Sequence, residues 1–129
     1  MSGRVLHHVA LGARDVERVV AFYRDVLGFT EQQRHFRDDG SLRSVWLDLG
    51  AGAALMVEHT DEAPHRVWGV GAGPFLIAVR VDQAERARLE AALEAAGAPV
   101  EGRTDHTSYA RDPEGNRVAI SHHPLMGRG

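Results

Sequence analysis

The pattern of apolar and polar positions predicts a strand near the start of the chain. Residues 5 to 12 alternate between two faces, which is the period of a β-strand. Apolar side chains then recur at helical spacing as far as Leu27, with Asp15 in the N-cap position and Gly28 just after the end. Three further strands are predicted between glycine-containing turns, at about 29–36, 42–49 and 53–59.

The same order of elements is expected again after a segment without periodicity. Residues 60–74 are rich in glycine and proline, which predicts a linker. Residues 75–81 alternate as a strand, and Asp82 and Glu85 have the spacing of a capping box at the start of a second helix. Gly97 ends that helix. Three short strands complete the pattern, around Val100, at 107–111 and at 117–122.

The spacing of the helix caps and of the glycines that end the helices indicates an internal duplication. The cap residues Asp15 and Asp82 are separated by nearly the same number of positions as the glycines Gly28 and Gly97. Chance caps seldom reproduce such a spacing together with the same order of elements. We therefore read the chain as two tandem strand–helix–strand–strand–strand modules.

The expected fold is α+β and occupies a single domain over residues 1–129, with modules at about 5–60 and 75–123. One helix covers one face of each sheet and leaves the other bare. Two bare faces of a curled sheet can enclose a cleft, with both helices on the outer face. Charged residues of the second helix, including Arg86 and Glu90, are expected to face solvent.

Composition argues against several classes of function. The formal net charge is -3 and charges of both signs are spread along the chain, so there is no basic stripe for a nucleic-acid backbone. The absence of cysteine excludes disulfides, zinc–thiolate clusters and a thiol nucleophile. No export signal or membrane-spanning apolar run is found. We expect a cytoplasmic protein with no nucleic-acid and no membrane partner.

Three segments resemble the vicinal oxygen chelate superfamily. They read HVAL at 8–11, FYRDVLG at 22–28 and YARDPEGN at 109–116. This superfamily includes glyoxalase I, fosfomycin-modifying transferases, extradiol dioxygenases and bleomycin-resistance proteins. The resemblance covers essentially the whole chain and implies the doubled fold described above, assembled as a homodimer. It indicates the function less sharply, because the fold hosts both enzymes and non-catalytic binders.

The resemblance also implies where a divalent metal would lie. By position, the ligands of the metal-dependent members fall on His8, on Glu58, at Phe75 or Leu76, and on Ala119. The first two carry donor atoms and the others do not. A catalytic ion usually has three protein ligands, so we expect an incomplete metal site and no cofactor. A divalent metal held by His8, Glu58 and an unrecognised donor is the alternative.

Aromatic and small side chains favour a binding site for a small molecule. The residues expected to line it are Trp46, Trp68, Phe75, Tyr109, Ala119 and Ser121. Aromatic walls hold flat ligands by stacking, and alanine leaves volume for them. The sequence therefore predicts a glyoxalase/bleomycin-resistance-like protein that binds an apolar or aromatic ligand in a cleft of the dimer.

Two enzymatic alternatives stay open at this point. One is a metal-dependent lyase, isomerase or dioxygenase that uses His8 and Glu58. The other is a metal-free enzyme in which the same two residues are catalytic as an acid–base pair. The second alternative requires these side chains to face each other.

Overall fold

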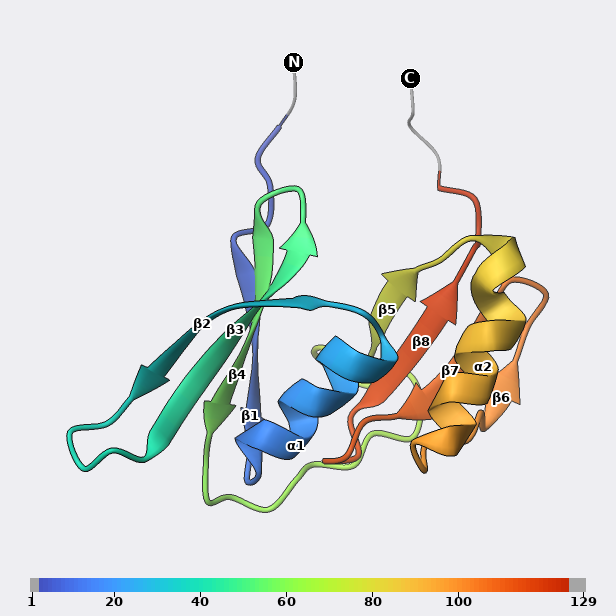
Figure 1. Cartoon of the computed structure of the whole chain (residues 1–129). Helices are drawn as coiled ribbons and strands as arrows, with labels where there is room; N and C mark the ends of the chain where they lie inside the picture. Colours follow the sequence, from blue (N-terminus) through green and yellow to red (C-terminus); the bar gives the residue numbers. More distant parts are fainter. Residues whose placement is uncertain (1–2, 126–129) are drawn as a thin grey trace. The chain divides into compact units, whose positions relative to one another are not determined.

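A computed structural model describes residues 3–125 of the chain, which falls into two units, one up to Pro64 and one from His65. The first unit contains β1 (His8–Ala13), α1 (Val16–Ala21), a π-helical turn η1 (Phe22–Val26), β2 (Thr30–Phe36), β3 (Leu42–Gly50) and β4 (Ala53–His59) (Figure 1). The second contains β5 (Ile77–Arg80), a 3-10 turn η2 (Gln83–Glu85), α2 (Arg86–Ala95), β6 (Gly102–Arg103), β7 (Thr107–Arg111) and β8 (Arg117–Ser121). The predicted α+β class and repeated element order are confirmed.

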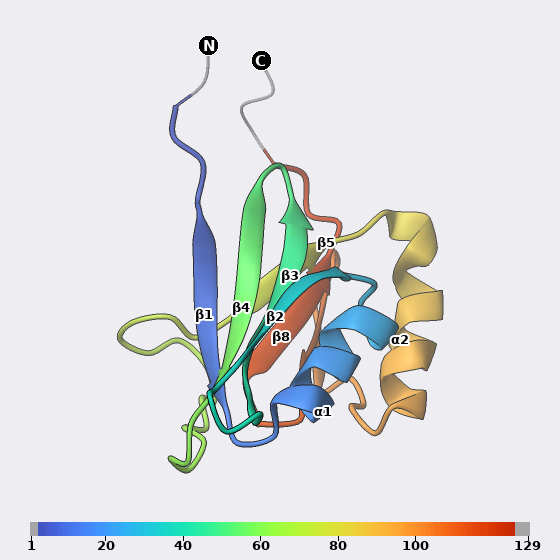
Figure 2. The ribbon, with the colours of Figure 1, turned by 60° about the vertical axis from the view of Figure 1, so that its left-hand side comes forward.

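Each unit builds its own four-stranded sheet with the same topology. The strand order is β1-β4-β3-β2 in the first sheet and β5-β8-β7-β6 in the second. In both sheets the first and last strands of the unit pair in parallel, whereas the other neighbours are antiparallel. Figure 2 shows β1 at the edge of the first sheet, beside β4. Matching topologies support the duplication inferred from the cap spacing.

The core of the first unit lies between α1 and one face of its sheet. Buried residues alternate along the two central strands, at Val45 and Leu47 in β3 and at Leu55 and Val57 in β4. From the helical side they are covered by Val19, Val20 and Tyr23. Since successive strand residues point to opposite faces, the residues between them lie on a face that α1 leaves uncovered. We call this the helix-free face of the first sheet.

The second unit has the same arrangement around α2. Leu89 and Leu93 are the buried residues of this helix, and Val118 and Ile120 are buried in β8. The capping box between Asp82 and Glu85 is present at the start of the helical segment, as predicted. Alternation along β8 again defines a helix-free face, here of the second sheet.

Two charged residues of α2 face the sheet, so the expectation of a fully solvated outer side was wrong for them. Arg86 Nε donates to Ser108 Oγ at 2.9 Å, and the same hydroxyl donates to Glu90. Arg86 also donates to three backbone carbonyls within 104–107. Hydrogen bonds from Arg103 and then Ser108 lower the pKa of Glu90. The physical reason is Ser108, a polar side chain on the helix-covered face that needs buried partners.

Several element ends differ from the sequence prediction. The first strand begins at His8, and Val5 and Leu6 lie exposed outside the sheet. The strand predicted at 75–81 covers only Ile77–Arg80, and the one around Val100 lies at Gly102–Arg103. The alternation of apolar and polar residues continues past the point where a neighbouring strand can form backbone hydrogen bonds, so the predicted strands are too long. Within residues 3–125 no helix is long and apolar enough to cross a membrane.

The turn between β7 and β8 is organised by one buried carboxylate. Asp112 Oδ1 accepts the backbone N–H groups of Glu114 and Asn116, both at 2.9 Å, and Oδ2 accepts Asn116 Nδ2 at 2.9 Å. Gly115 adopts a φ of 89°, in the left-handed region that favours glycine. Only 4% of Asp112 is exposed. This turn fixes the hairpin that carries the helix-free face of the second sheet.

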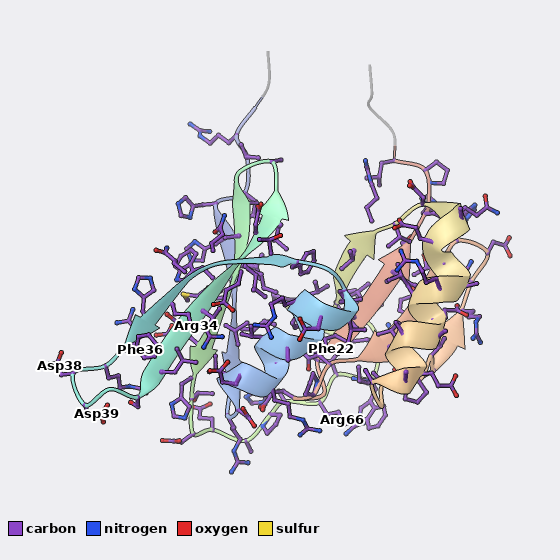
Figure 3. All side chains as sticks on the ribbon, viewed as in Figure 1. Phe22, Arg34, Phe36, Asp38, Asp39 and Arg66 are labelled. Atoms are coloured by element: carbon purple, nitrogen blue, oxygen red, sulfur yellow. The ribbon has the colours of Figure 1, made fainter. Side chains whose placement is uncertain are left out.

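We expect Asp112→Ala to lower the free energy of unfolding by about 2 to 3 kcal/mol, because buried donors lose a charged acceptor. Asp39→Ala is the matched control, since Asp39 also caps a turn, accepting from Ser41, but lies exposed at the tip of the β2–β3 hairpin (Figure 3). Its cost should stay below about 1 kcal/mol. Urea denaturation measures the free energy of unfolding of both variants. Equal decreases in the two variants would contradict the assigned role of Asp112.

Candidate functional site

The helix-free face of the first sheet carries an imidazole in contact with an indole. The ring centroids of His8 and Trp46 lie 4.7 Å apart at an interplanar angle of 54°. Trp46 is the register partner of Met56, which in turn lies opposite Ala10 in β1. We call His8 and Trp46 the His8–Trp46 pair. The sequence analysis named both residues as site candidates, and the strand register places both on this face.

A second imidazole is hydrogen-bonded to this pair. The Nδ1 atoms of His7 and His8 lie 2.8 Å apart, so one imidazole donates and the other accepts. The ring of His7 also lies edge-on to Trp46, at 6.4 Å between centroids. The hydrogen bond orients the His8 ring without using its Nε2 atom.

Glu58 shares the face of His8 but lies apart from it. In the β1–β4 register Glu58 is opposite Gly12, whereas His8 is opposite Ala54. Four positions along a strand correspond to about 13 Å. Glu58 pairs instead with Arg43, whose Nε lies 3.7 Å from its carboxylate. The first unit therefore does not assemble the acid–base pair that the sequence left as an alternative.

Small side chains occupy the middle of the helix-free face of the second sheet. Ala119 in β8 lies opposite Ala78 in β5 and Tyr109 in β7. Two positions further along β8, Ser121 is the register partner of Thr107 in β7, and their hydroxyl oxygens lie 2.8 Å apart. Tyr109, Ala119 and Ser121, which the sequence placed in the ligand site, thus lie on one face.

The two remaining predicted site residues lie outside the strands. Phe75 precedes β5. Trp68 belongs to the segment before it and is 74% exposed. The guanidinium carbons of Arg66 and Arg111 lie 5.0 and 5.1 Å from the centre of its indole, and Figure 3 labels Arg66 on this segment. Trp68 is therefore an exposed indole within cation–π distance of two arginines.

Sequence reasoning missed two arginines on the helix-free face of the second sheet. Arg111 and Arg117 are register partners across β7 and β8. The guanidinium carbon of Arg117 lies 4.2 Å from the ring centre of Tyr109, a cation–π contact. The signal was available, because the alternation that assigns Ala119 to this face assigns Arg117 to it as well.

The donor atoms present do not fit a three-ligand metal centre. Ala119 and its register partner Ala78 carry no donor, and the strand residues sharing their face include no imidazole or carboxylate. No three His, Asp or Glu side chains within residues 3–125 come together in a way that could hold a metal ion. A divalent catalytic ion usually needs three protein ligands, so no chemical step is derived through a metal.

Comparison with known proteins identifies relatives of this fold. A family model described as the Glyoxalase/Bleomycin resistance protein/Dioxygenase superfamily matches residues 5–120. No curated protein matches the chain. Among solved structures, a glyoxalase family protein from Enterococcus faecalis is 25% identical, with a TM-score of 0.70 over 92% of this chain and 97% of that one.

Two further solved structures show the same fold at lower identity. A mutant of the fosfomycin resistance protein FosX from Listeria monocytogenes, in complex with Mn(II) and dihydroxypropylphosphonic acid, is 20% identical, with a TM-score of 0.76 over 97% of this chain and 95% of that one. Lactoylglutathione lyase from Agrobacterium tumefaciens is 24% identical, with a TM-score of 0.69 over 98% and 99%.

Equilibration with Mn(II), Zn(II) or Ni(II) followed by desalting should leave far less than one ion per chain, because the helix-free faces supply too few donors. Elemental analysis of the desalted protein measures this. Retention of one ion per chain that is lost in His8→Ala, but not in His65→Ala, would overturn the conclusion drawn from the donor set.

Proposed function

Because the chain belongs to the Glyoxalase/Bleomycin resistance protein/Dioxygenase superfamily, we propose that it binds a small organic molecule through the helix-free face of its first sheet, without a metal. The ligand class is planar, with apolar or aromatic character. The observation that carries this proposal is the His8–Trp46 pair, with 4.7 Å between ring centres.

The His8–Trp46 pair lies on a face that no helix of its unit covers, so an aromatic ligand can stack on it. Each further ring stacked on such a pair adds on the order of 0.5 to 1.5 kcal/mol beyond its buried area. Met56, next to Trp46 in the register, supplies a flexible thioether that adapts to ligand shape.

One buried hydroxyl at a position of the same parity as Trp46 has no hydrogen-bond partner within the part of the chain that the structure describes. Ser44 Oγ is buried and has no hydrogen-bond partner among residues 3–125. Buried polar atoms in native proteins nearly always have a partner. Ser44 is fully buried, so this atom lies inside the sheet and is not counted among the ligand contacts.

An NMR titration with the neutral planar probe naphthamide tests the proposal. The indole N–H signal of Trp46 should shift, and the apparent Kd should rise at least about tenfold in His8→Ala and in Trp46→Leu, which is about 1.4 kcal/mol of lost contact. Phe36→Leu removes an exposed aromatic side chain from the end of β2 and should leave the Kd unchanged.

If naphthamide leaves the Trp46 signal in place, or if all three variants bind it equally, the proposed site is wrong. The Trp68 indole signal is assigned by comparison with Trp68→Phe, so the two tryptophans are read separately.

We also propose that the chain forms a homodimer. The exposed apolar side chains of Val5 and Leu6 precede β1, which lies at the edge of its sheet. Contiguous exposed apolar residues mark interaction surfaces. Light scattering after size exclusion should give twice the chain mass of 14.1 kDa, and Val5→Asp combined with Leu6→Asp should give a monomer. A monomeric unsubstituted chain would contradict this assembly.

A further inference from the structure

Two arginines lie side by side on the helix-free face of the second sheet. Arg111 and Arg117 are Cα partners in the β7–β8 ladder, and their side chains are only 11% and 20% exposed. Like charges directly opposite each other across two strands are destabilising. Partial burial increases that cost, since less water is available to screen the charges.

The described residues compensate only part of this positive charge. Glu101 is the one carboxylate in residues 3–125 that pairs with either arginine, at 3.1 Å from Arg111 Nε and 4.0 Å from Arg117 Nε. Arg111 Nη1 donates to the backbone carbonyls of Val67 and Gly115. These carbonyls are neutral, so two cations share a single anion.

Among residues 3–125, Arg117 forms fewer hydrogen bonds than Arg111. Its Nε is buried and has no hydrogen-bond partner in the described part of the chain. The guanidinium is held against the Tyr109 ring, with 4.2 Å between its carbon and the ring centre. This cation–π contact holds the guanidinium at Tyr109 but satisfies none of its N–H donors. A planar guanidinium with free donors matches the two oxygens of a carboxylate or phosphoryl group.

Aromatic and cationic groups continue beyond Arg117. The guanidinium carbon of Arg111 lies 5.1 Å from the centre of the Trp68 ring, and that of Arg66 lies 5.0 Å from it. The segment that carries Trp68 is tied to the sheet through the bond from Arg111 to Val67. An anion beside Arg117 would thus have a third cation and an exposed indole on the same unit.

We propose that the second unit binds an anionic group at Arg117 and Arg111, between the rings of Tyr109 and Trp68. The group is a carboxylate or a phosphoryl oxyanion, and the rings favour one attached to a planar aromatic body. This site goes beyond the neutral, planar recognition proposed for the first unit and does not depend on it.

The test is an NMR titration of the full chain with benzoate, phenylphosphonate and benzamide, followed on the side-chain Nε–H signals of the arginines. Benzoate, phenylphosphonate or both should shift the Arg117 signal and bind at least tenfold more tightly than benzamide. The tighter of the two anions identifies the oxyanion class. Arg117→Gln should reduce binding of that anion at least tenfold, and Arg117→Lys should restore part of it.

Arg88→Gln is the matched control, because it removes the same charge from the exposed surface of α2, where Arg88 pairs with Glu85. It should leave anion binding unchanged. If Arg88→Gln weakens binding as much as Arg117→Gln, or if benzamide binds as tightly as the anions, the site is wrong. Trp46 reports separately on the first unit, so failure of the naphthamide titration would not affect this outcome.

Discussion

Each unit of this protein has one helix and a sheet with two faces, and the helix can cover only one of them. In the first unit α1 packs on β3 and β4 and buries Val45 and Val57. In the second, α2 packs on β8 and buries Val118 and Ile120. Every candidate site residue on a strand lies on the opposite, helix-free face. The positions available for ligand chemistry follow from this single constraint, because alternation assigns each strand residue to one face or the other.

The order of helices and strands was largely predictable because the residues that begin helices and form turns act through short-range hydrogen bonds. Asp15 accepts the backbone N–H of Arg18 as a helix cap, and Asp112 holds its turn by short-range hydrogen bonds. Such bonds depend on residues within four positions, which a sequence displays directly. The ends of strands depend on distant partners. β1 starts only at His8 because β4, its neighbour, begins nearby in the register, and the sequence around Val5 contains no sign of this.

The candidate site was predictable by face but not by position along the strand. Alternation placed Ala119 and Ser121 on one face and His8 and Glu58 on one face, and the strand register agrees with both groupings. Alternation could not give the register, which puts Glu58 opposite Gly12. The same limit applies to Arg86, whose place beneath the sheet depends on a hydroxyl far along the chain. Pairings between remote segments decide which groups meet, and periodicity within one segment does not contain that information.

The parallel pairing of β1 with β4 also has a consequence for how the protein folds. Parallel neighbours need a long crossover connection, and the partner of His8 is Ala54, near the other end of the first unit. The second unit repeats this with Ala78 and Ala119. Closing such long loops costs chain entropy before any contact is gained, so these pairings form late. We therefore expect the strand that carries His8 to join a helix and a hairpin that have already formed.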